Sequence, residues 1–316
     1  MVPPHLLWQV EHGWPTLELL ANAKRVQHQP VTPVQFVWGQ IQLIHPFAFP
    51  IWMAGLVFYL RAARGDGVRF LGWTYVVLFV AALLSQAKTY YLAPAYPMLL
   101  AGGSVAIERW TEIRRRWLRP SLIVLLLAGS GILAPYVLPI LPVETVPEYV
   151  RLLGMTEVRP ERRAVGTVPQ LFADMLGWPE VVAAVGRAHA SLPPAERARA
   201  AIWSGGYGDA GAVDFFGRTV GLPRAISGYQ NYYLWGPGEF TGEVAITVGI
   251  SGEHLRPWFE SVEPVETVRC DLCMPDRAET PIHIVRGLKI PVEQFWPMVK
   301  CWTCDLPVFA AEARQS

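Results

Sequence analysis

The chain has 316 residues, a formal net charge of +1 and four cysteines, and 52% of its residues are hydrophobic. A nearly neutral charge excludes the broad basic surface of nucleic-acid-binding proteins, so we expect no nucleic-acid partner. Charged residues make up only 17% of the chain, against about 25% in soluble domains, and they are spread evenly only after residue 143. This asymmetry predicts a membrane α-helical half followed by a soluble α/β domain, residues 144–316.

Four apolar runs follow one another in the first half and are candidates for transmembrane helices. They cover residues 47–60, 70–87, 89–107 and 120–143, the first beginning near His45. A helix needs about 20 mostly apolar residues to cross a membrane, and membrane helices tolerate prolines such as Pro94 and Pro97. We therefore predict about four transmembrane helices in residues 46–143, preceded by an outer loop and interfacial segment in residues 1–45. Buried helices of a large soluble protein are the alternative.

The arginines predict the orientation of these helices. They are concentrated between the first and second runs and between the third and fourth: Arg61, Arg64, Arg69, Arg109, Arg114, Arg115, Arg116 and Arg119. The positive-inside rule makes both loops cytoplasmic, so Lys88 and residues 144–316 face outward. We expect a multi-pass membrane protein with an extracytoplasmic C-terminal domain.

Strands and helices alternate from Glu144 onward. The pattern predicts strands at 200–204, 243–249 and 281–285, and helices at 179–192, 255–262 and 292–302 together with one that ends near Phe216. This alternation is typical of an α/β domain with a largely parallel sheet.

Two segments of this domain invite a binding interpretation. The glycine-rich turn after Ser204 matches neither the dinucleotide fingerprint nor a Walker A loop, so a simple tight turn is favoured over a phosphate site. The segment Ser227–Trp235 interleaves aromatic rings with amides, as surfaces that bind carbohydrate or lipid headgroups do. Packing of this segment against the domain's own core is an equally open alternative.

The four cysteines form two pairs, Cys270 with Cys273 and Cys301 with Cys304, each with two residues between. This spacing fits a structural zinc site. The expected oxidising compartment instead favours disulfides or free thiols, which we prefer, with zinc as the alternative. We expect no cofactor.

The run Gln86–Pro97 resembles the lysine-tyrosine-proline segment of bacterial family 39 glycosyltransferases, relatives of protein O-mannosyltransferases and of aminoarabinose transferases. Other stretches are also similar to that family: His12–Glu18 with Asn22 and Lys24, Asp214–Gly217, Ser227 and Gly228, Asn231 and Tyr232, Cys273–Pro275 and Arg286–Leu288. The resemblance implies the GT-C architecture and a membrane glycosyltransferase that uses a polyprenyl-phosphate-linked sugar donor at the outer face of the bacterial inner membrane.

The family's catalytic acidic residue lies in the first outer loop, which has no counterpart in this sequence. The chain also opens at Met1 without a basic region or signal-peptide core. We therefore expect a C-terminal portion whose N-terminal transmembrane part is missing. Its catalytic residues are unknown, and we expect the isolated chain to transfer no sugar.

Lys88, Tyr90 and Tyr91 are the candidate site for the donor's lipid phosphate. Lys88 supplies a charge and the tyrosines supply hydroxyl donors, although Lys and Tyr also serve as interfacial anchors. His12, Glu18 and Lys24 are possible residues of the same cleft. The partners implied are the lipid-linked sugar and membrane lipid, and the competing function is a non-enzymatic, membrane-anchored protein that binds glycan or lipid.

Overall fold

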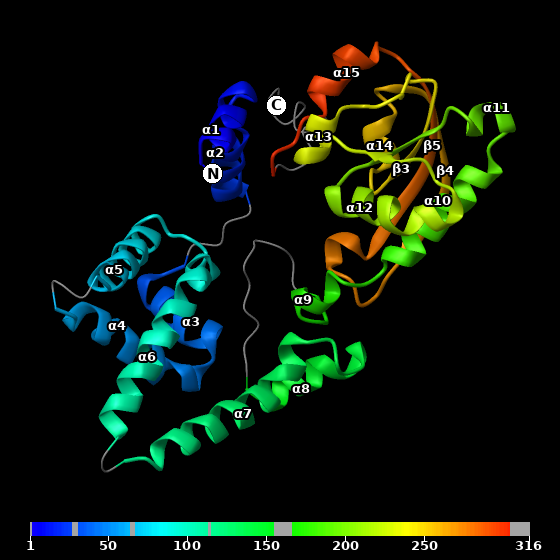
Figure 1. Ribbon diagram of the computed structural model, residues 1–316. Helices are drawn as coiled ribbons and strands as arrows, with labels where there is room; N and C mark the ends of the chain where they lie inside the picture. The colour runs from blue at the N-terminus through cyan, green and yellow to red at the C-terminus, as the bar shows by residue number, and fades with distance from the viewer. Residues whose placement is uncertain (1, 27–30, 64–66, 113–114, 155–165, 304–316) are drawn as a thin grey trace. The chain divides into compact units, whose positions relative to one another are not determined.

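The computed structural model describes residues 2–26, 31–63, 67–112, 115–154 and 166–303 (Figure 1). Its internal contacts divide the chain into two compact units. The helical unit is Gln29–Pro160, and the sheet unit combines Met1–His28 with Glu161–Ser316. Residues 2–26 thus pack with the C-terminal part of the chain, far from them in the sequence.

The helical unit contains only helices over its described residues. They are α3 (Pro33–Ile44), η1 (Pro46–Ala48), α4 (Phe49–Arg61), α5 (Arg69–Leu84), η2 (Thr89–Ala95), α6 (Tyr96–Thr111), α7 (Leu118–Val137), η3 (Val143–Thr145) and α8 (Val146–Leu152), where η denotes a 3₁₀ helix. Thr32 precedes α3 and forms a capping box with Gln35. The Thr32 hydroxyl accepts a hydrogen bond from the backbone N–H of Gln35, and the Gln35 side-chain oxygen accepts one from the backbone N–H of Thr32. His45, at a φ of 96°, and Pro46 end that helix and redirect the chain.

The prediction of about four transmembrane helices is wrong. Among the described residues, α7 is the single helix long and apolar enough to cross a membrane, and α3 with the η1–α4 segment would add a second only if their 95° bend were part of one span. Helix α5 has 16 residues, about 24 Å of rise against a hydrocarbon core of about 30 Å. The third run is divided between η2 and α6 near Pro94 and Pro97. Apolar composition marks these runs, but prolines and chain breaks set the lengths of the helices.

Glycines bring α4 and α6 into close contact. Gly55 faces the backbone carbonyl of Leu99, and Gly103 faces that of Ile51, so a Cβ atom at either glycine would collide with backbone. Leu99 is completely buried at this crossing. Close approach through small residues is the usual way for helices to pack where polar side chains are scarce. Helices α4 and α6 are therefore packed at backbone distance where they cross.

We expect Gly55→Ala to destabilise the helical unit by about 1–3 kcal/mol, because overpacking at a backbone contact forces the helices apart. The matched control is Gly131→Ala in α7, where a Cβ atom meets nothing within 4 Å. Alanine there should be neutral or slightly stabilising through its higher helix propensity. Thermal unfolding of both detergent-solubilised variants, followed by circular dichroism, checks the difference. Equal midpoints for the two variants would contradict the close packing.

The sheet unit is an α/β assembly around a five-stranded mixed sheet. Its strands are β1 (Ala201–Ser204), β2 (Ala225–Ile226), β3 (Val244–Val248), β4 (Phe259–Arg269) and β5 (Glu279–Leu288). Its helices are α1 (Val2–Glu11), α2 (Pro15–Val26), α9 (Gln170–Ala173), α10 (Trp178–Ser191), α11 (Pro194–Arg197), α12 (Tyr207–Phe216), η4 (Gly217–Val220), α13 (Asn231–Trp235), α14 (Gly252–Leu255), η5 (Pro275–Arg277) and α15 (Val292–Met298).

The strand order is β2-β1-β3-β5-β4, and the pairing changes direction within the sheet. Strand β1 is parallel to β2 and β3, whereas β5 is antiparallel to β3 and β4. Residues of α10 and α12 form one buried cluster with the sheet, and residues of α15 form a second cluster with other sheet residues. The chain leaves β1 through α12 to β2 and then reaches β3 on the other side of β1. This reversal makes the carboxyl ends of β1 and β3 a topological switch point.

Several predicted elements of this unit are confirmed. Strands β1, β3 and β5 and helices α10 and α12 lie where the sequence pattern places them. The prediction of a largely parallel sheet is wrong, because two of the four strand pairings are antiparallel. The final helix, α15, ends at Met298, four residues before Trp302.

The helix predicted at 255–262 is also wrong, because its second half belongs to β4. Helix α14 ends at Leu255, just before Pro257, and the chain pairs with β5 from Phe259 onward. The pairing register shifts between Pro264 and Glu266, at a bulge on the edge strand of the sheet. Edge strands and bulges are the positions where a sheet tolerates proline.

Candidate functional site

The 3₁₀ helix η2 carries the three residues predicted to bind a lipid phosphate. Lys88 is the residue before its first turn, and Tyr90 and Tyr91 are 43% and 51% exposed. The Lys88 Nζ atom lies 5.8 Å from the centroid of the Tyr90 ring, and the Tyr90 and Tyr91 rings pack edge to face with centroids 5.0 Å apart. One short accessible segment therefore presents an ammonium group and two phenol rings.

A buried hydrogen-bond network fixes the start of η2. The Gln40 side chain, 1% exposed, donates from Nε2 to the Thr89 carbonyl at 3.0 Å. Its Oε1 atom accepts from the Tyr96 hydroxyl at 2.8 Å, and the Tyr96 hydroxyl lies 3.2 Å from that of Tyr75. A polar network inside an apolar unit holds its members in one arrangement, because an unmade bond there is costly. The segment beside Lys88 is thus held by α3, α5 and α6 together.

The surroundings of η2 are strongly apolar. Helix α5, which precedes it, exposes large hydrophobic side chains along much of its length: Phe70, Trp73, Val77, Leu78, Val80 and Leu84. So many exposed large apolar side chains on one helix favour contact with lipid or with another protein. Chemically, Lys88 can form a charge-assisted hydrogen bond to a phosphate oxygen while Tyr90 and Tyr91 donate from their hydroxyls.

We expect Tyr96→Phe to leave the Gln40 amide oxygen buried without its donor, at a cost of about 1–3 kcal/mol. Because Gln40 also holds Thr89, amide hydrogen exchange in η2 should become faster in this variant. The control is Tyr59→Phe, which removes a 2.9 Å bond to the Met98 carbonyl outside the network. Exchange in η2 measured by mass spectrometry should stay at the wild-type rate in that control. Unchanged exchange in Tyr96→Phe would show that the network does not hold the segment.

His12, Glu18 and Lys24, the possible cleft residues, belong to helices α1 and α2 of the sheet unit. The His12 ring stacks on Trp8 with centroids 4.5 Å apart. Glu18 accepts a 2.7 Å hydrogen bond from the Lys300 ammonium, and Lys24 is exposed. Glu18 therefore has a structural contact, which fastens α2 to the chain near residue 300.

The aromatic segment Ser227–Trp235 packs mainly against its own domain. The Tyr232 hydroxyl donates to Asp214 at 2.8 Å, and the Tyr233 ring stacks on Trp296 with a centroid distance of 5.9 Å. Trp235 is 57% exposed, beneath the guanidinium of Arg224. The structure thus favours the core-packing alternative for the two tyrosines and leaves one exposed ring.

Cys270 and Cys273 form a disulfide, so the disulfide alternative holds for this pair. Cys301 is also disulfide-bonded, while Cys304 lies outside the described residues. The bond between Cys270 and Cys273 uses both sulfur atoms that a zinc ion would need from this pair. Within the described ranges, no group of three or more His, Cys, Asp or Glu residues could hold a metal ion.

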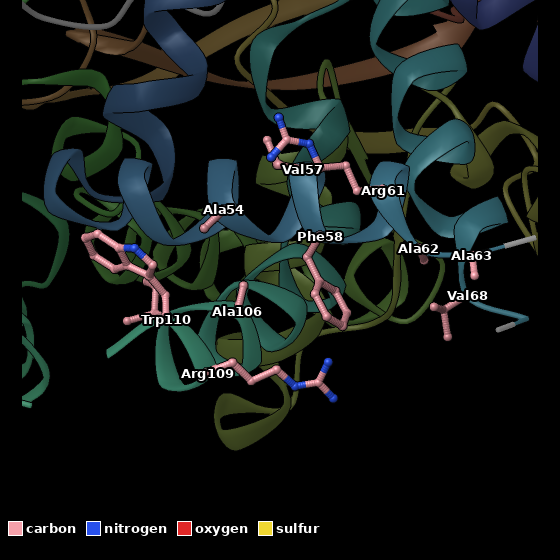
Figure 2. A pocket seen from close by; sticks show the side chains of 11 residues that line it. Ala54, Val57, Phe58, Arg61, Ala62, Ala63, Val68, Ala106, Arg109 and Trp110 are labelled. Carbon is pink, nitrogen blue, oxygen red and sulfur yellow. The ribbon is translucent and has the colours of Figure 1, made fainter. Parts of the chain in front are cut away.

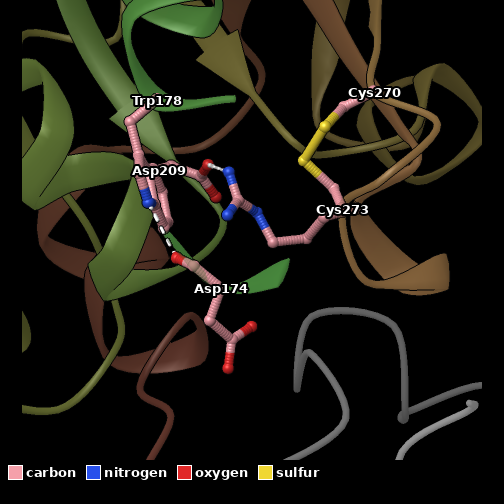
Figure 3. The surroundings of a disulfide bond; sticks show 6 residues. Asp174, Trp178, Asp209, Cys270 and Cys273 are labelled. Carbon is pink, nitrogen blue, oxygen red and sulfur yellow. Dashed lines mark hydrogen bonds and ion pairs between the residues drawn. A yellow bond between two sulfur atoms is a disulfide. The ribbon is translucent and has the colours of Figure 1, made fainter. Parts of the chain in front are cut away.

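An ion pair that sequence reasoning missed lies beside this disulfide (Figure 3). Arg277 and Asp209 are 3.6 Å apart, each side chain 15% exposed, and the Arg277 guanidinium lies 3.5 Å from the centroid of the Trp178 ring. Asp209 is in the first turn of α12, after the glycine-rich turn that leaves β1. Burial raises the pKa of the Asp209 carboxyl, and the charge of Arg277 opposes part of that shift. The glycine-rich turn pointed to this end of β1, but no local signal linked it to Arg277.

The raised pKa predicts how Asp209 affects stability. In the pH range from its ordinary value of 3.8 upward to the raised value, the folded state keeps a proton that the unfolded state has lost, so stability falls as pH rises. Asp209→Asn does not ionise. We therefore expect the unfolding midpoint of this variant, relative to wild type, to rise between pH 4 and pH 7. The exposed Asp271 in the neighbouring loop supplies the control, Asp271→Asn. A relative midpoint that falls with pH would mean that the pairing with Arg277 outweighs burial.

Comparison with protein-family models, with curated proteins and with solved structures finds no match to this chain.

Proposed function

We propose that this chain is the donor-binding part of a membrane glycosyltransferase that takes its sugar from a polyprenyl-phosphate-linked donor. The observation that carries the proposal is η2, where Lys88, Tyr90 and Tyr91 are presented together from an apolar helical unit. A polyprenyl phosphate needs apolar surface for its chain and a cation with hydrogen-bond donors for its phosphate. The resemblance of residues 86–97 to family 39 glycosyltransferases supports the same donor.

A location at the bacterial plasma membrane, with the sheet unit outside the cytoplasm, agrees with two further features. Helix α7 is long and apolar, and it is largely unburied. The disulfide of Cys270 with Cys273 and the disulfide-bonded state of Cys301 are typical of an oxidising compartment. A lipid-linked donor presented at the outer face would meet the chain in that compartment.

A second candidate function follows from the charges around η2. Lys88 is the only charged residue between Arg69 and Glu108, so this stretch supplies no carboxylate to activate an acceptor hydroxyl. The same site would then serve a membrane-anchored protein that binds a lipid-linked sugar without transferring it. Transfer from a polyprenyl-phosphate sugar to an acceptor by the purified chain would exclude this second function.

We expect Lys88→Ala to weaken polyprenyl-phosphate binding roughly 10- to 150-fold, the equivalent of losing a charge-assisted hydrogen bond of about 1.5–3 kcal/mol. Lys88→Arg should restore part of the affinity, because it keeps the charge while changing the donor geometry. Binding is measured with the chain in nanodiscs. The control is Lys289→Ala in the sheet unit, where the ammonium bonds the Arg256 carbonyl. If the Lys88→Ala variant bound polyprenyl phosphate within twofold of the wild-type affinity, Lys88 would not be a phosphate ligand and the proposed donor site would be wrong.

A further inference from the structure

A second candidate lipid site lies at the other end of α6. A groove of about 1080 Å³ opens between α4 and α6, beyond the glycines at which the two helices cross (Figure 2). Two helices that touch at glycines separate on either side of the contact, which leaves this space. Arg109 is 13 residues after Tyr96 along α6, or about 20 Å at 1.5 Å per residue. The groove is therefore distinct from the site at Lys88.

The groove combines apolar walls with a basic rim. Its larger apolar lining residues include Val57, Phe58, Ile107 and Trp110, and several alanines also line it. Arg61 and Arg109 are exposed at the rim, and the Arg109 guanidinium lies 5.6 Å from the centroid of the Phe58 ring. No described residue that lines the groove is acidic.

The basic character continues outside the groove. The Arg115 guanidinium covers the Trp110 ring at 4.6 Å, while Glu108, the nearest acidic residue along α6, lies 4.0 Å from Arg119. Arg61 and Arg109 both line the groove, on opposite sides of Phe58 in Figure 2, in a region of net positive charge among the described residues. This charge complements an anion, and the apolar walls complement a hydrocarbon chain.

We propose that this groove binds an anionic glycerophospholipid, with its negatively charged headgroup attracted by Arg61 and Arg109 and an acyl chain against Phe58 and Trp110. Basic pockets between helices of membrane proteins are sites of this kind, because an arginine fork matches phosphate oxygens while the lipid tail stays in apolar surroundings. A soluble phosphate compound would leave the exposed Trp110 and Val57 without an apolar partner. The inference rests on the membrane location in the proposed function, but not on donor binding at Lys88.

The test measures binding of acyl-labelled phosphatidylglycerol and phosphatidylcholine to the full chain in detergent by fluorescence anisotropy. Wild type should prefer phosphatidylglycerol. The double variant Arg61→Gln/Arg109→Gln should lose at least about tenfold in affinity for that lipid and little for phosphatidylcholine. The control pair Arg151→Gln/Arg218→Gln removes two exposed arginines elsewhere and should bind as wild type does. Ala106→Phe, which fills the groove, should weaken both lipids.

Three results would overturn the proposal. They are equal binding of the two lipids by wild type, unchanged phosphatidylglycerol binding in the double variant, and displacement of that lipid by equimolar polyprenyl phosphate at the same arginines. The last would make the groove a donor site instead. Each variant must keep the wild-type circular dichroism spectrum and unfolding midpoint, so that any loss of binding is not a loss of folding. The outcome for Lys88→Ala is measured with a different lipid, so failure of the proposed function would be seen separately.

Discussion

The helical unit depends on the buried amide of Gln40. Its side chain is almost completely enclosed by apolar residues, where an unpaired amide would cost several kcal/mol. The amide is satisfied only when α3, η2 and α6 are in register, because Gln40 bonds both Thr89 and Tyr96. A single polar group therefore fixes the position of the exposed segment that carries Lys88. The binding segment gains order from a residue that no ligand needs to touch.

Helix α6 links the two candidate lipid sites. Its first turn follows η2, its middle packs on α4 through Gly103, and its last turns form one wall of the arginine groove. The crossing with α4 produces both rigidity and the groove, since helices in contact at one point must diverge beyond it. Lys88 lies before the start of this mostly apolar segment, and Arg109 lies in its last turn. This arrangement suits lipids, whose charged and apolar parts are also separated.

The sheet unit relies on contacts between distant segments. Arg277, in the connection between β4 and β5, reaches Asp209 at the start of α12 and packs on Trp178 at the start of α10. The disulfide between Cys270 and Cys273 lies in the same connection. Gly177 packs beside this disulfide, where a Cβ atom would be only 3.0 Å from the Cys273 sulfur. The β4–β5 connection is thereby joined to α12, which packs on β1 and β2, and to α10, which packs on β3, β4 and β5.

The sequence by itself determined the elements whose pattern is local. Helices α10 and α12 and strands β1, β3 and β5 follow from the spacing of apolar residues and from glycines and prolines at their ends, and Lys88 stands out as an isolated charge in an apolar region. Only the tertiary structure decided that Phe259–Arg269 is a strand, because pairing with β5 outweighs its local preference. The pair of Asp209 with Arg277 and the groove lined by Arg61 and Arg109 were likewise invisible in the sequence. Each depends on contacts between residues far apart in the chain, and no local pattern of residues encodes such distances.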